Sequence, residues 1–240
     1  MQTANKINYI GGLKSGVPIA MGYFAVSFTL GIAARKVGMT AFQATLMSFT
    51  NSTSAGEFAA LSTIAAGASY LEMAVMQFVI NLRYMLMSCA LSQKIDHSFS
   101  VIHRFLMGFG VTDEIFGVSI SVNGKLNPYY TYGAMSLAIP AWSLGTMFGV
   151  LMGSVLPSNV VSALSIALYG MFLAIIIPPA RDNLILTILV PVSMAISYAF
   201  SKLPYLKDIS AGTKVIILTV LIAGAAAVLF PIKEDDTDAE

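Results

Sequence analysis

Long apolar runs separated by short polar or charged stretches organise this chain. The first run, Gly16–Ala34, ends at Arg35 and Lys36, and similar runs follow it. A helix needs about 20 apolar residues to cross the roughly 30 Å of hydrocarbon in a bilayer. We therefore expect an all-α, polytopic integral membrane helical bundle with about seven or eight transmembrane segments. The expected spans are Gly16–Ala34, Ala41–Gly67, Ser69–Ser92, Phe105–Val122, Tyr132–Val155, Val160–Ile177, Leu184–Phe200 and Val215–Phe230.

The second run, Ala41–Gly67, differs from the others. It is interrupted at Thr50–Glu57, where no aliphatic side chain is larger than alanine. Unwound backbone at membrane depth exposes polar groups that hydrocarbon cannot satisfy, so it must line a cavity or be buried in protein. We expect a discontinuous second segment, which either crosses the membrane or turns back as a re-entrant hairpin. The Lys and Arg bias of the short loops is too small to choose, and it leaves the membrane orientation open.

Composition agrees with a membrane protein, since 57% of the 240 residues are hydrophobic and only 10% are charged. Thirteen Lys and Arg nearly balance twelve Asp and Glu, so no basic excess indicates a nucleic-acid partner. We expect the lipid bilayer to be the main surroundings of a single membrane domain over residues 1–240. That domain would have an N-terminal lead-in at 1–15 and an acidic tail at 233–240.

Enzyme chemistry has little support in the sequence. No nucleophilic triad, phosphate-binding loop or paired-histidine motif occurs, and the single cysteine, Cys89, cannot form an internal disulfide or assemble a zinc cluster. We expect neither enzymatic activity nor a metal or cofactor.

Four charged residues fall inside expected spans: Glu57, Arg83, Asp113 and Glu114. Each costs at least a few kcal/mol at bilayer depth unless it faces a polar cavity or another charge. If Arg83 pairs with one acid, another acid must carry a proton, bind a cation or contact water. Each of these states is useful to a transporter, so Glu57, Asp113 and Glu114 are the candidate proton-coupling residues.

The interrupted segment is the candidate binding site. Broken helices in transporters direct half-helix N-termini, with their positive dipole ends, at anionic substrate groups. Ser52 and Ser54 are suitable N-caps for the second half-helix, so we expect an amino-acid carboxylate to be held near residues 51–56. The alternative is a simple bend in which Ser and Thr bond to the preceding turn. The candidate substrate-binding residues are Asn51, Ser52, Thr53, Ser54, Gly56, Glu57, Asn81 and Arg83.

Spacing within the helices restricts these roles. Asn81 and Arg83, two residues apart, face different sides of a helix and cannot both point into one narrow site. Arg83 therefore either locks two helices as an ion pair or contacts the substrate. Asp113 and Glu114 diverge by about 100° around the helix axis, so one can pair with Arg83 while the other carries a proton.

Small residues recur at a helical spacing in the fifth expected span. Gly145, Gly149 and Gly153 lie on one face and allow close approach of another helix. That helix could belong to this chain or to a partner subunit.

Four ordered motifs carry a family resemblance. They are Thr53-Ser54-Ala55-Gly56-Glu57-Phe58-Ala59-Ala60, Asn81-Leu82-Arg83-Tyr84, Thr112-Asp113-Glu114, and Trp142 followed by Gly145 and Gly149. In this order and spacing the chain resembles the AzlC family, the large permease subunit of bacterial branched-chain amino-acid exporters. One departure is Glu57, which stands where the family usually has Gln.

The resemblance implies a secondary transporter subunit that exports branched-chain or related neutral amino acids across the bacterial cytoplasmic (inner) membrane. It also implies a small AzlD-like membrane subunit as partner. Proton coupling through Glu57, Asp113 or Glu114 is the mechanism we expect. Two other functions stay open: an ion channel subunit lined by the same acids, and a non-transporting membrane scaffold in which the charges are only interhelical ion pairs.

Overall fold

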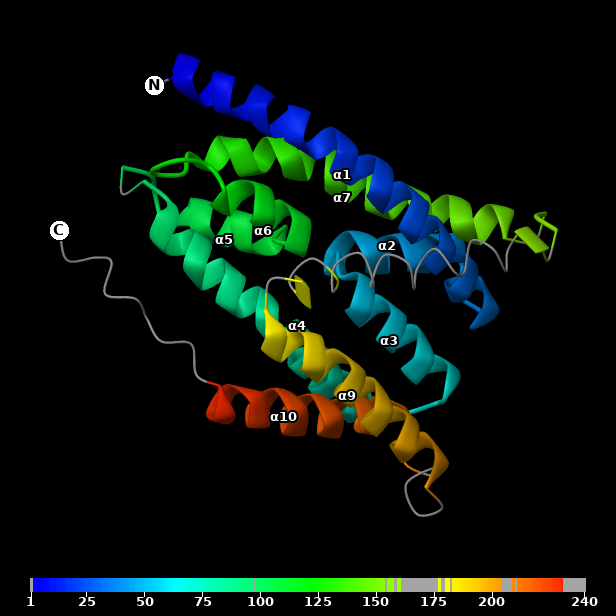
Figure 1. Ribbon diagram of the computed structural model, residues 1–240. Helices are drawn as coiled ribbons and strands as arrows, with labels where there is room; N and C mark the ends of the chain where they lie inside the picture. Colours follow the sequence, from blue (N-terminus) through cyan, green and yellow to red (C-terminus); the bar gives the residue numbers. More distant parts are fainter. Residues whose placement is uncertain are drawn as a thin grey trace.

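The computed structural model describes residues 2–153 apart from 97, and residues 155–157, 159–160, 177, 180–181, 183–203, 209 and 211–230. In this part of the chain all regular elements are helices, which confirms the all-helical class (Figure 1). The helices are α1 (Gln2–Lys36), α2 (Ala41–Asn51), α3 (Ser54–Ala65), α4 (Tyr70–Lys94), α5 (Ile102–Phe109), α6 (Asp113–Ile120), α7 (Pro128–Met152), α9 (Leu184–Lys202) and α10 (Ala211–Leu229).

Four of the described helices, α1, α4, α7 and α9, are long and apolar enough to cross a membrane. Large apolar side chains such as Phe78, Leu86 and Ile188 are exposed on them, which fits contact with lipid. The full number of seven or eight spans stays a prediction. Most of the expected span 160–177 and the acidic tail 233–240 lie outside the described residues.

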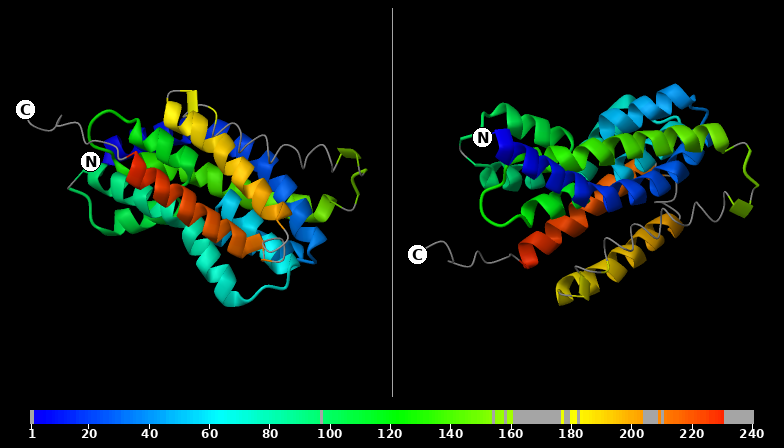
Figure 2. Two further views of the ribbon diagram at one scale, coloured as in Figure 1. Left: turned by 60° about the horizontal axis from the view of Figure 1, so that its bottom comes forward. Right: turned by 90° about the horizontal axis from the view of Figure 1, so that it is seen from above.

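Helices α1 and α7 lie side by side with their backbones in contact. A Cβ atom on Gly12 would stand 1.8 Å from the Tyr130 carbonyl oxygen, and one on Gly31 would stand 2.1 Å from the Thr146 carbonyl oxygen. Residue numbers increase in the same direction at both contacts, so the two helices are parallel. A Cβ on Gly145 would likewise meet Ser27 and Phe24 of α1, so this glycine face packs within the chain. Figure 2 shows α1 and α7 side by side.

Helix α1 begins at Gln2, so residues expected as a lead-in form its first turns. Side-chain bonds at both ends of the α1–α7 pair fix its register. Asn127 Nδ2 donates to Asn5 Oδ1 at 2.9 Å at one end, and Arg35 Nη1 donates to the Val150 carbonyl oxygen at 2.9 Å at the other.

The chain breaks between α2 and α3, inside the expected discontinuous segment. Ser52 adopts the left-handed conformation with φ 46°, and Thr53 is extended with its hydroxyl accepting the Gly56 N–H at 3.4 Å. The N-cap of α3 is therefore Thr53, and the expectation of Ser52 or Ser54 was wrong, because Ser52 caps the end of α2 and Ser54 is already helical. That α2 and α3 together make one membrane segment stays a prediction.

A second break replaces the expected span Phe105–Val122, which was wrong as a single helix. The chain forms α5 and α6 instead, separated by residues 110–112. Thr112 is extended and its hydroxyl accepts the Ile115 N–H at 3.3 Å, so it starts a new helix. A Cβ on Gly110 would stand 2.1 Å from Met135 Cε, so a larger residue in this turn would require the Met135 side chain to move.

The two breaks lie close together. Phe49, near the end of α2, packs against Phe109, at the end of α5, with ring centroids 6.4 Å apart. Helix α4 contacts both α3 and α6, while α10 packs against α4 and beside α9. The N-termini of α3 and α6 therefore meet inside the bundle.

Candidate functional site

The meeting point of α3 and α6 encloses a small polar pocket. Its free space is about 10 Å³, which is close to what a single water molecule needs. A larger molecule could enter only if these elements moved apart. The pocket is lined by Tyr23, Ser52, Ser54, Tyr84, Thr112, Asp113, Glu114 and Trp142.

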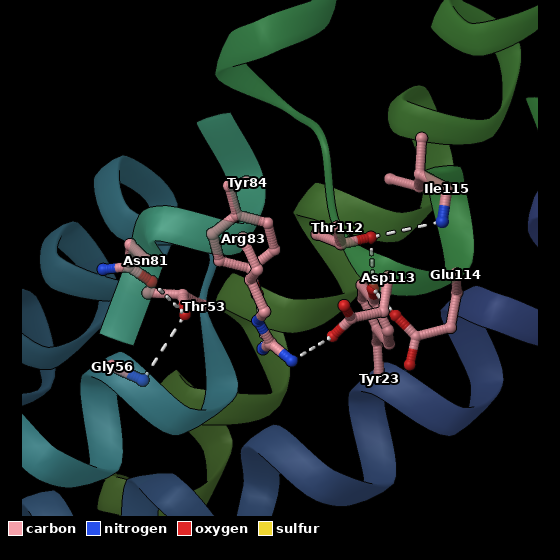
Figure 3. A network of polar contacts seen from close by, with 10 residues as sticks. All are labelled: Tyr23, Thr53, Gly56, Asn81, Arg83, Tyr84, Thr112, Asp113, Glu114 and Ile115. Carbon is pink, nitrogen blue, oxygen red and sulfur yellow. Dashed lines mark hydrogen bonds and ion pairs between the residues drawn. The ribbon is translucent and has the colours of Figure 1, made fainter. Parts of the chain in front are cut away.

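An ion pair joins α4 to the tip of α6 beside this pocket. Arg83 Nη1 lies 3.0 Å from Asp113 Oδ2, and the two side chains are 37% and 20% exposed (Figure 3). Arg83 Nη2 also donates to the Tyr84 hydroxyl at 3.1 Å, and the guanidinium lies 4.8 Å from the centre of that ring. Arg83 is thus held by an acid and an aromatic face, in the cation–π arrangement.

The second acid of α6 is held by a residue of α1. The Tyr23 hydroxyl donates a short hydrogen bond to Glu114 Oε2 and is also bonded to Thr112 Oγ1 at 2.6 Å (Figure 3). Tyr23 is buried and packs edge-on against Trp142 at 5.3 Å. Adjacent acids on α6 thus have different partners, which agrees with their divergence around the helix.

Glu57 lies behind the pocket, between α3, α2 and α7. It is fully buried and accepts hydrogen bonds from Ser48 Oγ at 2.5 Å, Trp142 Nε1 at 2.8 Å and the Thr53 N–H at 3.2 Å. All three donors are neutral. Ser48 continues this network to Thr146 of α7 at 2.8 Å, so Glu57 ties the α2–α3 tip to α7.

Asn81 and Arg83 point to different helix tips, as their spacing predicted. Thr53 Oγ1 donates to Asn81 Oδ1 at 3.0 Å, and Asn81 Nδ2 donates to Gln77 Oε1 at 3.1 Å. Gln77 Nε2 in turn donates to the Gly56 carbonyl oxygen at 2.7 Å. This chain of amides holds the start of α3 against α4, whereas Arg83 holds α6.

The expected site residues therefore separate into groups. Ser52, Ser54, Asp113 and Glu114 line the pocket, and Arg83 adjoins it through Asp113. Thr53, Gly56 and Glu57 are buried in the wall behind it, where Asn81 also bonds. Asn51 is an exposed residue at the end of α2 and does not line the pocket.

Sequence reasoning missed several residues of this site. Tyr23 gave no signal, because a lone tyrosine in an apolar run also suits the core of a bundle. Thr112 carried a detectable signal as an N-cap ahead of two acids. In the described part of the chain, no group of three or more His, Cys, Asp or Glu side chains could hold a metal ion. Ser48 and Gln77 were also missed, and Tyr84 and Trp142 were named only as parts of the family motifs and not as site residues.

The fold and site define the class as an all-helical membrane protein with charged groups gathered around a central pocket. The chain belongs to the AzlC family. The family model described as AzlC protein matches residues 18–156, more than half of the chain. That range contains all the residues of the pocket and of the network behind it.

Two relatives are similar over much of the same region. An uncharacterized membrane protein of Archaeoglobus fulgidus is 33% identical over 174 residues, covering 72% of this chain and 76% of that protein. The inner membrane protein YgaZ of Escherichia coli is 25% identical over 150 residues, covering 61% of each chain. No solved structure matches the chain.

Proposed function

We propose that this protein is the large subunit of a secondary transporter that exports branched-chain or related neutral amino acids. Family membership and the membrane-protein relatives support a transport function. The observation that carries the proposal is the ion pair of Arg83 and Asp113 beside Glu114, at the meeting point of two helix N-termini. In a bilayer such charges are costly unless a function retains them.

The charges of this site match those of a zwitterion. A neutral amino acid carries one carboxylate, which suits Arg83 and the positive ends of α3 and α6, and one ammonium group, which suits Asp113. In the closed pocket Arg83 and Asp113 neutralise each other. A bound amino acid would separate them and pair with both. Ser52 and Ser54 would contact its backbone groups from the α3 side.

The remaining carboxyl group suits proton coupling. Among the described residues of this cluster, two carboxyl groups face one guanidinium, and Glu114 receives only the neutral donor Tyr23. One proton on Glu114 would neutralise the cluster. We therefore propose Glu114 as the coupling acid. Glu57, enclosed by neutral donors and turned toward α7, is proposed to anchor the α2–α3 tip.

The transporter is proposed to work in the cytoplasmic membrane of a bacterial cell as a multi-pass protein. By its resemblance to the family it would act with a small AzlD-like membrane subunit. The single permease domain over residues 1–240 is part of the same proposal.

The test is counterflow of labelled leucine or valine in vesicles that contain the chain together with its small partner. We expect uptake above that of empty vesicles, with saturation and a preference for the L-enantiomer. A panel of neutral amino acids should be included, because the branched-chain preference rests on the resemblance. No uptake of any amino acid in the panel would refute the substrate class.

Flux measurements in the same vesicles distinguish a transporter from a channel and from a scaffold. A channel would show flux that does not saturate and no stereoselectivity. A scaffold would show no flux, and neutralising Asp113 would then impair assembly alone.

A further inference from the structure

The parallel pair of α1 and α7 gives the bundle two ends that serve as a reference. We call the end at Asn5 and Asn127 the N-end, and the end at Arg35 and Val150 the C-end. Helix α7 has 25 residues and is about 37 Å long, enough to cross a bilayer. Contacts of the other helices with α7 therefore report how deep each of them lies.

Helices α2 and α3 both have their outer ends at the C-end. Helix α2 begins at the C-end, just after Lys36. It then runs toward the middle of α7, since Ser48 bonds Thr146 and Glu57, in the first turn of α3, bonds Trp142. Helix α3 starts at that central level and returns. The contacts with α4 show that α3 runs antiparallel to it. Thr53 at the start of α3 bonds Asn81 in the middle of α4, whereas Thr63 near the end of α3 contacts Met76, nearer the start of α4.

Helix α4 runs from the C-end to the N-end. Ile95, just after its last residue, forms a bridge with Leu126 immediately before α7. Arg83 lies in the middle of α4 and reaches the central pocket through Asp113. Tyr70, at the other end of α4, must then lie toward the C-end, and the end of α3 lies beside it.

Helices α5 and α6 make the opposite turn. His103 at the start of α5 bonds Tyr132 near the N-end, while Phe109 at its end reaches Phe49 in the middle of the bundle. Helix α6 leaves the central pocket at Thr112 and returns, since Ser119 bonds Thr131 near the start of α7 at 3.0 Å.

The lengths agree with half-crossings. Helices α2 and α3 have 11 and 12 residues, and α5 and α6 have 8 each, so they are about 12–18 Å long. None could cross roughly 30 Å of hydrocarbon alone. Figure 1 shows the ends of α1, α3 and α7 at one side of the molecule and the loops around α5 and α6 at the other.

We propose that α2–α3 and α5–α6 are two re-entrant hairpins that enter the membrane from opposite faces and meet at the Arg83–Asp113 pair. The hairpin α2–α3 closes the pocket to the face at the C-end, and α5–α6 closes it to the face at the N-end. The gating role rests on the proposed transport function, whereas the topology does not.

An inverted repeat explains this arrangement. A long helix followed by a hairpin occurs twice, as α1 with α2–α3 and as α4 with α5–α6, and the two units run in opposite directions. Each long helix also contacts the hairpin tip of the other unit through a tyrosine. Tyr23 of α1 bonds the N-cap Thr112, and Tyr84 of α4 lines the pocket together with Ser52 and Ser54 at the other tip. Inverted repeats of this kind place transporter sites at the midplane.

Cysteine labelling tests the topology without any transport. In a Cys89→Ser background, single cysteines replace the exposed residues Thr3, Lys36, Ala66, Ser100 and Asn123, and an impermeant maleimide is applied to vesicles of each orientation. We expect K36C and A66C to react from one face, and T3C, S100C and N123C from the other. Labelling of K36C and A66C from opposite faces would overturn the proposal.

The same experiment contains its control. Thr3 and Asn123 lie at the starts of the parallel helices α1 and α7, so T3C and N123C react from one face whether the broken segments cross or turn back. Ser100 and Asn123 flank α5–α6. The two residues lie on opposite faces of the membrane only if that segment crosses it. Labelling of S100C and N123C therefore tests the second hairpin independently of the first.

Paired disulfides test the gating role. Ser48 and Thr146 join α2 to α7 with hydroxyl oxygens 2.8 Å apart, and Ser119 and Thr131 join α6 to α7 at 3.0 Å. With a reporter cysteine at Ser54 in the pocket, oxidised S48C/T146C should stop labelling from the C-end face alone. Oxidised S119C/T131C should stop it from the N-end face alone. Equal loss from both faces, or no labelling of S54C before oxidation, would reject the gates and leave the topology standing.

Discussion

The tips of α3 and α6 begin alike and hold their acids differently. Both start at an extended threonine that caps the helix, and both carry acids in the first turn. In α3 the acid is Glu57, a full turn beyond Thr53, where it faces α7 and three neutral donors. In α6 the acids directly follow Thr112, so they stay at the pocket. The offset from the cap thus decides whether an acid bonds to a neighbouring helix or lines the pocket.

Removal of the anchoring acid gives the largest expected effect. Glu57→Ala leaves the buried donors of Trp142 and Thr53 without an acceptor, while Ser48 keeps its bond to Thr146, and each unpaired group costs about 1–3 kcal/mol. We expect roughly 2–6 kcal/mol of lost stability and little folded protein in detergent, measured by thermal unfolding. Glu57→Gln keeps an acceptor and is the matched control, with full transport expected. Stable Glu57→Ala protein, or inactive Glu57→Gln protein, would contradict the anchoring role of Glu57.

Neutralising Asp113 should abolish transport and spare the fold. Asp113→Asn removes the counter-ion of Arg83 but keeps a hydrogen-bond acceptor of the same size, so the loss of stability should be smaller than that of Glu57→Ala. In the proposed mechanism, transport depends on both charges. We expect counterflow to fall about 100-fold, which corresponds to about 2.8 kcal/mol. A charge swap, Arg83→Asp with Asp113→Arg, should restore stability but not transport. Transport by the swapped protein would mean that the pair is structural.

Replacing Glu114 should change the response to pH. Glu114→Gln keeps a partner for Tyr23 but cannot release a proton. We expect counterflow that no longer varies with pH, whereas Glu57→Gln protein should vary as the wild type does. The measurement is exchange flux over a pH series with equal pH on both sides of the vesicle membrane. If pH dependence disappears in Glu57→Gln protein instead, the anchoring and coupling roles are reversed.

The smallest effect is expected for Tyr23→Phe. This change removes one hydroxyl that contacts Glu114 and Thr112, and keeps the ring against Trp142. A hydrogen bond to a charged group is worth about 1.5–3 kcal/mol, so we expect a tenfold or somewhat larger loss of transport. Tyr70→Phe is the control, because Tyr70 is 92% exposed. Equal effects of the two changes would show that the Tyr23 hydroxyl has no particular role.

The first break and the divergence of the site residues could be predicted from the sequence. The run Thr50–Glu57 lacks large aliphatic side chains, and a single helix cannot hide such a run in lipid. Helical geometry also separated Asn81 from Arg83, and Asp113 from Glu114. The break between α2 and α3 and the different partners of these side chains follow from local composition and from 3.6 residues per turn. That the two halves form one discontinuous membrane segment stays a prediction.

The second break and the role of Tyr23 could not be predicted in the same way. Phe105–Val122 is apolar enough to read as a span, and its break is marked by the N-cap Thr112 and by the close approach of Gly110 to Met135, a residue of α7. Tyr23 meets Glu114 only because α1 packs in parallel beside distant parts of the chain. Contacts between residues far apart in sequence leave no periodic signal.

The contact of α1 with α7 also sets an order of assembly. A growing chain inserts α1 first, but the glycine face of Gly12 and Gly31 finds its partner only when α7 has been made, after both hairpins and α4. Until then α1 has only lipid or the insertion machinery against that face. The pocket needs Tyr23 from α1 and Trp142 from α7, so it closes in one late step. The pocket therefore stays incomplete until synthesis has passed α7.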